Sequence, residues 1–300
     1  MRHSNGHNNS IINGVGRIGY MRGGQKAVWR DEDLAEQFLS EAEKFIKEDP
    51  EKPFFLYYAL HQPHVPRVPN PKFAGKSGLG PRGDVIMEMD HCVGKLTAFL
   101  EKEGLLDNTI LLFTSDNGPV LDDGYMDDAE RFNAMAQHRP AGPLRGGKYS
   151  KFEGGARIPL IVSWKSHIRP AVSHALVSQV DFAASFASML GVDLGDWAPD
   201  SQDHLDAFLG ESIEGREEIF AEAANKSHFL RQGKWTYMQP SEGPAHDFTT
   251  NIELGNSRDH QLFNMEYDVG QRINVAEIHP DLVEKMSRRI EEIMASARTR

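Results

Sequence analysis

The sequence predicts an α/β fold in which helices flank a layered sheet, followed by a small C-terminal antiparallel sheet and helix. Amphipathic helical stretches alternate with short apolar, β-branched runs through the first two thirds of the chain, which is the order typical of a layered α/β domain. Beyond about residue 212 the pattern changes to closely spaced short strands and one closing helix. We therefore expect two parts, residues 1–212 and residues 213–300.

The first expected elements are a helix and a buried strand. Residues 1–25 are polar and glycine-rich, which favours a loop. Residues 31–48 place apolar side chains on one helical face and are stopped by prolines, so they predict a helix. The apolar run over 53–60 predicts a buried strand. Prolines in the segment 61–66 cannot continue a ladder of strand hydrogen bonds, so the strand ends there.

The next elements repeat the same alternation. Residues 84–103 carry an amphipathic stripe that predicts a helix. Residues 109–115 are apolar and β-branched and predict a buried strand, and a second short strand is expected over 158–164. A helix over 181–190 is expected to end at Gly191, a residue that suits the left-handed position after a helix.

The last part of the chain predicts three strands and a helix. The strands are expected over 218–224, 228–231 and 234–238, with Gln232-Gly233 as a tight hairpin between the last two. Residues 280–295 form an amphipathic pattern that closes the chain as a helix.

Composition limits the classes of function. The net charge of −11 over 300 residues argues against general binding to nucleic acid or to an anionic membrane. A single cysteine excludes an intrachain disulfide, and no apolar run approaches the length of a membrane span. The first twenty residues contain no apolar core of a signal peptide, so the chain expressed as given is expected in the cytoplasm.

The most informative stretch is the end of the strand over 109–115. The strand runs into Asp116-Asn117 and then breaks at Gly118-Pro119. In open α/β sheets, ligands bind at the carboxyl ends of strands. Carboxylate and amide oxygens are the hard ligands that Ca²⁺ or Mg²⁺ prefers. The alternative is a simple turn, because Asp-Asn-Gly-Pro is good turn chemistry anywhere.

Three other polar clusters follow strands or lie in loops. His61 and His64 sit among prolines, a setting that suits catalysis or contact with an anion. The segment 142–148 offers glycines for close backbone approach, and it offers Arg145 and Lys148 for positive charge. Each cluster also has a plainer interpretation, as surface histidines or a flexible basic turn. In a third cluster Glu153 and Arg157 are expected to pair and hold their loop.

The order and spacing of these pieces carry more weight than any one of them. The series His61-Gln-Pro, Ser115-Asp-Asn-Gly-Pro, Arg145-Gly-Gly-Lys and Glu153-Gly-Gly-Ala-Arg-Ile-Pro resembles the sulfatases of the alkaline phosphatase superfamily. It is most similar to the formylglycine-dependent, Ca²⁺-binding type I sulfatases, or arylsulfatases. The stretches 261–270 and 274–276 are similar to a C-terminal motif of that family, so the resemblance runs from near residue 11 to the end.

The resemblance implies an alkaline-phosphatase-like layered sheet and a set of roles for individual residues. Asp116 and Asn117 would be two ligands of Ca²⁺, with Mg²⁺ as a possible substitute. Lys148 would contact the sulfate and its bridging oxygen. His64 would bind the sulfate and protonate the leaving alcohol. His61 and Arg145 are second candidates for binding the substrate.

Some parts of the family pattern are missing from this sequence. The nucleophile of the family is a formylglycine made from Cys or Ser in a Cys/Ser-x-Pro/Ala-x-Arg motif, and the chain has no such motif. Cys92 has Gly94 where the motif needs Pro or Ala, and it lies in the helix expected over 84–103. The adjacent Asp ligands of the first strand are absent too. We expect an amino-terminally truncated sulfatase that alone hydrolyses sulfate esters poorly or not at all.

The function expected from these residues is sulfuric ester hydrolysis on sulfated carbohydrate. The sugar is inferred from the segments 13–20 and 122–127, which are similar to those of bacterial sulfatases that desulfate glycans. The alternatives are a phosphodiesterase or phosphonate monoester hydrolase of the same superfamily, or a non-catalytic module that binds sulfated glycans. The full-length protein is expected in the periplasm or outside the cell. Its expected partner is a sulfated small molecule or glycan and not a nucleic acid, and no membrane span is expected.

Overall fold

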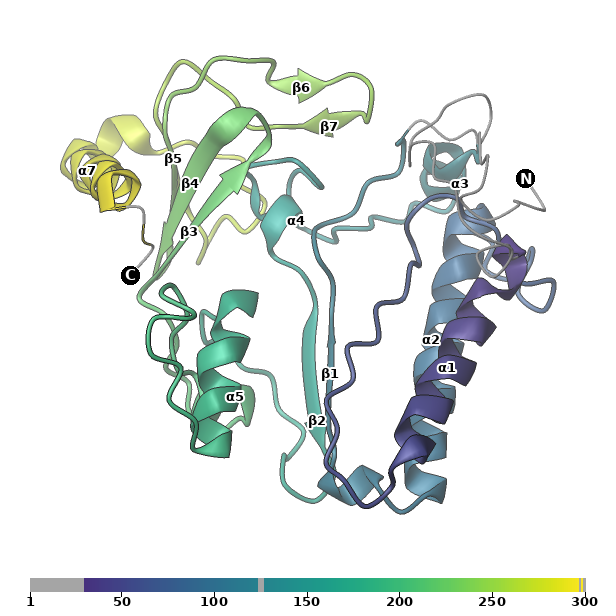
Figure 1. Cartoon of the computed structure of the whole chain (residues 1–300). Helices are drawn as coiled ribbons and strands as arrows, with labels where there is room; N and C mark the ends of the chain where they lie inside the picture. The colour runs from purple at the N-terminus through teal and green to yellow at the C-terminus, as the bar shows by residue number, and fades with distance from the viewer. Residues whose placement is uncertain (1–29, 124–126, 297, 299–300) are drawn as a thin grey trace. The chain divides into compact units, whose positions relative to one another are not determined.

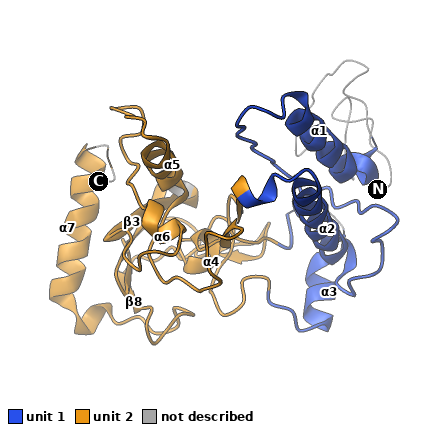
Figure 2. Cartoon of the chain, turned by 90° about the horizontal axis from the view of Figure 1, so that it is seen from below, with its two compact units in different colours: residues 1–107, 121–139 blue, residues 108–120, 140–300 orange. Residues whose placement is uncertain are grey.

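The computed structural model describes residues 30–123, 127–296 and 298 (Figure 1). The segments 1–25 and 13–20 and part of 122–127 lie outside the described residues. The backbone forms two units, residues 1–107 with 121–139 and residues 108–120 with 140–300 (Figure 2). The boundary expected near residue 212 falls within the second unit and stays a prediction.

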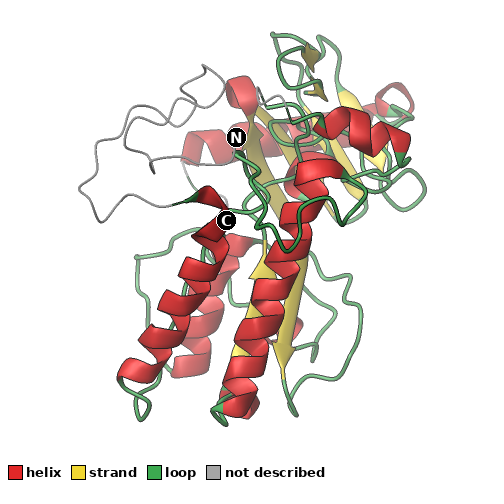
Figure 3. Ribbon diagram, turned by 90° about the vertical axis from the view of Figure 1, so that its right-hand side faces the viewer, coloured by secondary structure: helices red, strands yellow, loops and turns green. Residues whose placement is uncertain are grey.

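The first unit is built on two long helices that pack along each other (Figure 3). A 3₁₀ turn over Asp31–Asp33 leads into α1 (Leu34–Glu48), as the sequence predicted. The second helix, α2 (Gly80–Lys102), begins four residues earlier than expected. A short helix, α3 (Ala129–Met135), also contacts α2. The buried apolar residues of α1 and α2 are Ala35, Ala42, Ile46, Val85, Cys92, Leu96, Phe99 and Leu100.

The strand predicted over 53–60 is not formed. The segment alternates half-buried and exposed side chains as a strand would, with Phe55 at 77% and Tyr57 at 83% exposure. Within the described ranges, no strand pairs with this segment. A strand needs a neighbour for its backbone hydrogen bonds, and the side-chain pattern predicted the extended conformation without specifying that neighbour.

In the second unit, a two-stranded antiparallel sheet carries the Asp116-Asn117 turn. A 3₁₀ turn over Leu106–Asn108 precedes β1 (Ile110–Thr114), which pairs with β2 (Leu160–Trp164). The antiparallel pairing differs from the parallel order that a βαβ alternation favours. Because Thr114 pairs with Leu160, the end of β1 lies beside the start of β2, directly after the short helix α4 (Glu153–Ala156).

The C-terminal antiparallel sheet and helix are confirmed. Its strands are ordered β3 (Glu218–Ala223), β4 (Ser227–Gln232), β5 (Trp235–Met238) and β8 (Gln261–Asn264), and α7 (Pro280–Ser296) packs against β4 and β5 (Figure 1). Gln232 pairs with Trp235, so the hairpin loop is Gly233-Lys234, one residue later than predicted. The core between this sheet and α7 contains Leu230, Tyr237, Leu262, Val283, Met286, Ile290 and Ile293.

Smaller elements complete the unit. A hairpin joins β6 (His246–Asp247) to β7 (Ile252–Glu253). The helix α5 (Phe182–Leu190) ends at Gly191, whose φ of 66° confirms the predicted left-handed cap. The other short elements are α6 (Leu205–Phe208) and 3₁₀ turns over Gln179–Asp181, Ala224–Lys226 and Ala276–Ile278. No helix of the described ranges is long and apolar enough to cross a membrane.

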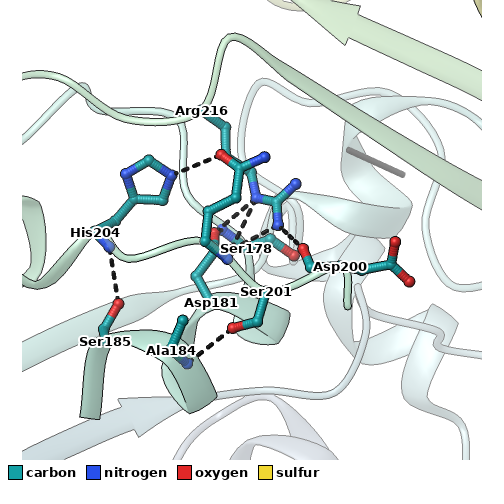
Figure 4. Close-up of polar contacts among 9 residues, drawn as sticks. Ser178, Asp181, Ala184, Ser185, Asp200, Ser201, His204 and Arg216 are labelled. Atoms are coloured by element: carbon teal, nitrogen blue, oxygen red, sulfur yellow. Dashed lines mark hydrogen bonds and ion pairs between the residues drawn. The ribbon is translucent and has the colours of Figure 1, made fainter. Parts of the chain in front are cut away.

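A buried ion pair ties α5 to the start of the C-terminal sheet (Figure 4). The Arg216 guanidinium donates to both carboxylate oxygens of Asp181, with distances of 2.6–3.0 Å, and both side chains are almost fully buried. The Asp181 carboxylate also accepts from the backbone N–H groups of Ser178 and Gln202. Since every carboxylate oxygen has donors, the buried charge is compensated.

We predict that Arg216→Met destabilises the protein by about 3–5 kcal/mol, because it leaves the Asp181 carboxylate charged, buried and without its cation. Arg288→Met is the matched control, since Arg288 pairs with Glu284 on the exposed surface of α7. That control is expected to cost less than about 1 kcal/mol. Urea denaturation measures both values, and equal costs for the two variants would contradict the prediction.

Candidate functional site

Asp116 and Asn117 form a turn at the carboxyl end of β1, as predicted. The Asn117 backbone N–H donates to Asp116 Oδ1 at 3.0 Å, which fixes the exposed carboxylate against the chain. The Asn117 side-chain amide donates its N–H to the Gly118 carbonyl at 2.9 Å. Asn117 Oδ1 is therefore the amide atom left to act as a ligand. The Gln179 side-chain amide donates to the Ser115 carbonyl at 2.8 Å and holds the end of β1.

Glycines bring this turn against the helix α4. The Gly118 N–H donates to the Gly155 carbonyl at 2.9 Å. A Cβ added at Gly118 would lie 1.8 Å from the Gly154 carbonyl oxygen, a distance that no side chain tolerates. The residue must therefore be glycine for the two backbones to approach this closely.

Backbone contacts of the same kind hold the loop that carries Lys148. The Lys148 N–H donates to the Pro119 carbonyl at 2.9 Å, and the Gly154 N–H donates to the Arg145 carbonyl at 2.8 Å. A Cβ at Gly147 would lie 2.4 Å from the Pro119 carbonyl oxygen. The hydrogen bond to Pro119 thus places Lys148 beside the turn that contains Asn117. Lys148 and Asn117 are 31 positions apart in the sequence.

The Lys148 side chain keeps its charge available. The side chain is half-buried, and its ammonium lies 5.4 Å from the centre of the Tyr149 ring. In the part of the chain that the structure describes, the Lys148 ammonium pairs with no carboxylate. An unpaired cation on a rigid loop suits contact with an anion.

Arg145 has different surroundings. Its guanidinium makes a two-point ion pair with Glu253, donates to the Gln271 carbonyl at 2.8 Å and lies 4.1 Å from the Phe152 ring centre. The hydrogen bond from Arg145 lowers the pKa of the Glu253 carboxyl. These contacts are those of a residue that holds the loop, while its proposed contact with substrate stays a prediction.

The expected pairing of Glu153 and Arg157 is confirmed, at 3.7 Å. Glu153 also accepts from Arg231 at 3.1 Å and from the Thr236 hydroxyl at 3.2 Å. The carboxylate therefore fastens α4 to the C-terminal sheet, which agrees with a structural role.

The two predicted histidines lie in the first unit. His64 is exposed, and its Nδ1 lies 2.8 Å from the Val65 carbonyl oxygen. A carbonyl only accepts, so Nδ1 carries the proton and Nε2 is the basic nitrogen. His61 is half-buried in the same loop. The loop is anchored by Arg67, whose side chain is 1% exposed and donates to the Pro63 carbonyl at 3.1 Å and to Asp127 at 2.8 Å.

The donor set at Asp116 and Asn117 fits part of a Ca²⁺ site. A carboxylate and an amide oxygen are suitable ligands, but Ca²⁺ takes six to eight oxygens. Across residues 30–123 and 127–296, no group of three or more His, Cys, Asp or Glu side chains is arranged to hold a metal. The assignment of Asp116 and Asn117 as Ca²⁺ ligands therefore stays a prediction, in which they would be two ligands of a larger set.

Cys92 behaves as an inert core residue. It lies in α2 with 1% exposure, more buried than expected for a half-buried helix cysteine. Burial raises the pKa of its thiol to about 11. Since only the thiolate is a good nucleophile, this residue does not supply one near neutral pH.

Comparison with known proteins settles the family. A family model described as sulfatase matches residues 4–192, more than half of the chain. The chain belongs to the sulfatase family. The resemblance drawn from the short motifs is therefore confirmed.

Sulfatases are also the relatives that the chain matches in sequence and in structure. An N-acetylgalactosamine-6-O-sulfatase of Bacteroides thetaiotaomicron is 48% identical over the whole chain, and the match spans 58% of that protein. Human arylsulfatase A is 32% identical over 75% of the chain and 45% of its own length. A solved Bacteroides thetaiotaomicron sulfatase structure, from work on glycosaminoglycan metabolism, superposes with a TM-score of 0.89 at 47% identity, covering 96% of the chain and 60% of that structure. The alkaline-phosphatase-like fold expected for the chain is that of these sulfatases.

Sequence reasoning missed one buried cation beside the site. Lys151 is fully buried, and its ammonium donates to the Gln239 carbonyl at 3.2 Å and the Ser241 hydroxyl at 2.9 Å. Burial lowers the pKa of this lysine to about 8. The sequence around Lys151 does not indicate this burial, because lysine is usually exposed.

We predict that Gly118→Ala disrupts the site and destabilises the second unit, because its Cβ meets the Gly154 carbonyl. Gly94→Ala is the control: it lies within α2, where an added Cβ meets nothing within 4 Å. Alanine there should raise stability by about 0.5–1 kcal/mol. Thermal denaturation compares the two variants, and a Gly118→Ala protein as stable as the wild type would contradict the close approach.

A second prediction concerns pH. The folded protein binds the Lys151 proton less tightly than the unfolded chain, with a pKa of about 8 against 10.5. The unfolded state therefore binds more protons between these values, and stability rises with pH across that window. Subtracting the pH dependence of Lys151→Met from that of the wild type, both from urea denaturation, should leave this rise. No difference between the two curves above pH 8 would contradict it.

Proposed function

We propose that the chain carries the sulfate-binding residues of a sulfuric ester hydrolase that acts on sulfated carbohydrate. The chain spans 58% of the curated Bacteroides relative, so the activity of the whole protein is part of this proposal. The observation that supports it best is the close backbone contact at the glycines of the site. These contacts hold Asp116, Asn117 and Lys148 on neighbouring loops.

The chemistry of these side chains suits a sulfate ester. Cleavage builds negative charge on the bridging oxygen and on the sulfuryl oxygens, and fixed cations and donors stabilise that charge. The Lys148 ammonium serves as the donor to the sulfate. We assign His64 the role of general acid: as the imidazolium, it delivers the proton on Nε2 to the leaving alcohol. A general acid typically contributes about 10²–10⁴-fold.

Two groups of the family enter the proposal differently. A Ca²⁺ ion held in part by Asp116 and Asn117 would supply positive charge to the sulfuryl oxygens. The formylglycine nucleophile does not fit this chain, because none of its 300 residues stands in the required motif. We therefore assign no step through that group.

The proposed substrate is a 6-sulfated N-acetylgalactosamine unit of a glycan. The support is the 48% identical relative, which is an N-acetylgalactosamine-6-O-sulfatase. Periplasmic or extracellular location of the full-length protein is proposed with it, since sulfated glycans lie outside the cell.

The test is binding of 6-sulfated N-acetylgalactosamine to the 300-residue chain by isothermal titration calorimetry, with Ca²⁺ present. Lys148→Ala should weaken binding by about tenfold or more, because a hydrogen bond to a charged group contributes about 1.5–3 kcal/mol. The control is Lys234→Ala, which removes an exposed lysine paired with Glu266 and should leave affinity unchanged.

The same experiment separates the alternatives. Preference for the 6-phosphorylated sugar over the sulfated sugar would favour a phosphoryl-ester hydrolase. Equal affinity of wild type and Lys148→Ala would contradict the proposed site. Assays with a chromogenic aryl sulfate are expected to show little or no turnover by this chain, and robust turnover would contradict the expectation that the chain lacks the nucleophile.

A further inference from the structure

We propose that Gln271, in the C-terminal part of the chain, is a positioning residue that sets the place of Lys148. It fastens both ends of the segment 145–153 in which Lys148 lies. The inference rests on the proposed role of Lys148 in gripping sulfate, and it assigns a function to a residue outside the sulfatase motifs of the site.

One glutamine makes two contacts that bracket the lysine. The Gln271 carbonyl accepts from the Arg145 guanidinium at 2.8 Å. The Gln271 side-chain Oε1 accepts from the Glu153 backbone N–H at 2.7 Å. Arg145 precedes Lys148 by three residues, and Glu153 follows it by five. Displacement of Gln271 would therefore remove one contact at each end of the segment.

The conformation of Gln271 indicates that these contacts matter. Its side chain is fully buried, and its φ is +50°, in the left-handed region that suits glycine. Such a backbone is strained for any residue other than glycine. Glycine would avoid that cost but would offer no acceptor to Glu153. The structure accounts for glutamine at this position through the acceptor that it supplies.

A local turn maintains the strained backbone. The Gln271 N–H donates to the Asp268 carbonyl at 3.0 Å. The Asp268 carboxylate then accepts from the backbone N–H groups of Arg272 at 2.7 Å and Ile273 at 2.8 Å. Gln271 is thus held from its own turn and does not depend on the segment that it fastens.

The strand β7 supports the same segment from another direction. Glu253 pairs with Arg145, and its backbone carbonyl accepts from the Ser150 hydroxyl at 2.6 Å. The Lys151 N–H donates to the Leu254 carbonyl at 2.9 Å. The C-terminal sheet region therefore acts as a frame for the Lys148 loop, with Gln271 as the part that reaches both ends.

The experiment compares three variants of the 300-residue chain. Gln271→Met keeps the length of the side chain but removes the acceptor, which leaves the Glu153 N–H unpaired. Gln271→Glu keeps an acceptor oxygen and is the rescue variant. Met286→Ala is the control for lost stability, because Met286 of α7 is fully buried in the core between this helix and the sheet, and its truncation destabilises the fold.

The first readout is amide hydrogen exchange, which needs no ligand. In Gln271→Met, exchange over 145–153 should rise by about tenfold, while β3 to β5 change little, because local opening is separable from global unfolding. In Met286→Ala any rise should spread over the C-terminal sheet. Gln271→Glu should recover most of the protection. Unchanged exchange over 145–153 in Gln271→Met, or an equal rise everywhere, would overturn the proposal.

The second readout is affinity for 6-sulfated N-acetylgalactosamine at a temperature where all variants are folded. Gln271→Met should bind about tenfold more weakly than the wild type, and Met286→Ala should bind as the wild type does. Wild-type affinity in Gln271→Met would overturn the positioning role. If the wild type itself binds no sulfated sugar, the proposed function fails, and the exchange measurements still decide whether Gln271 holds the segment.

Discussion

Backbone contact between three glycine-containing loops is the constraint on which the candidate site depends. The turn after β1, the Lys148 loop and α4 approach so closely that Gly118, Gly147 and Gly154 leave no room for a Cβ. Hydrogen bonds between main-chain groups then fix the register of one loop on another. Main-chain geometry of this kind does not vary with side-chain rotamers. The backbone that carries the charged groups is therefore ordered before binding and loses little conformational entropy when a ligand binds.

The elements with strong periodicity were predictable from the sequence, and one segment was not. The helices α1 and α7 follow amphipathic patterns that a single face explains. The residues 53–60 have the side-chain alternation of a strand, yet a strand is defined by its partner, which side-chain pattern does not identify. The hairpin after β4 shifted by one residue because Gly233 at positive φ, and not Gln232, takes the first position of the turn.

The chemistry of the site was predictable where it lies in contiguous motifs. Asp116, Asn117 and Lys148 stand in short glycine-containing stretches whose order identifies the family. The residues that hold those stretches come from remote parts of the chain: Arg145 meets Glu253 across 108 positions, and Glu153 meets Gln271 across 118. No local pattern reports such contacts, and Lys151 gives no sign in the sequence that it is buried.

The most direct test of the account is a crystal structure of the chain with 6-sulfated N-acetylgalactosamine and Ca²⁺. The account predicts a sulfate oxygen within hydrogen-bonding distance, about 2.7–3.2 Å, of the Lys148 ammonium. It predicts the ion about 2.3–2.6 Å from oxygens of Asp116 and Asn117. A sulfate bound elsewhere, with Lys148 facing solvent and no ion at the turn after β1, would contradict it.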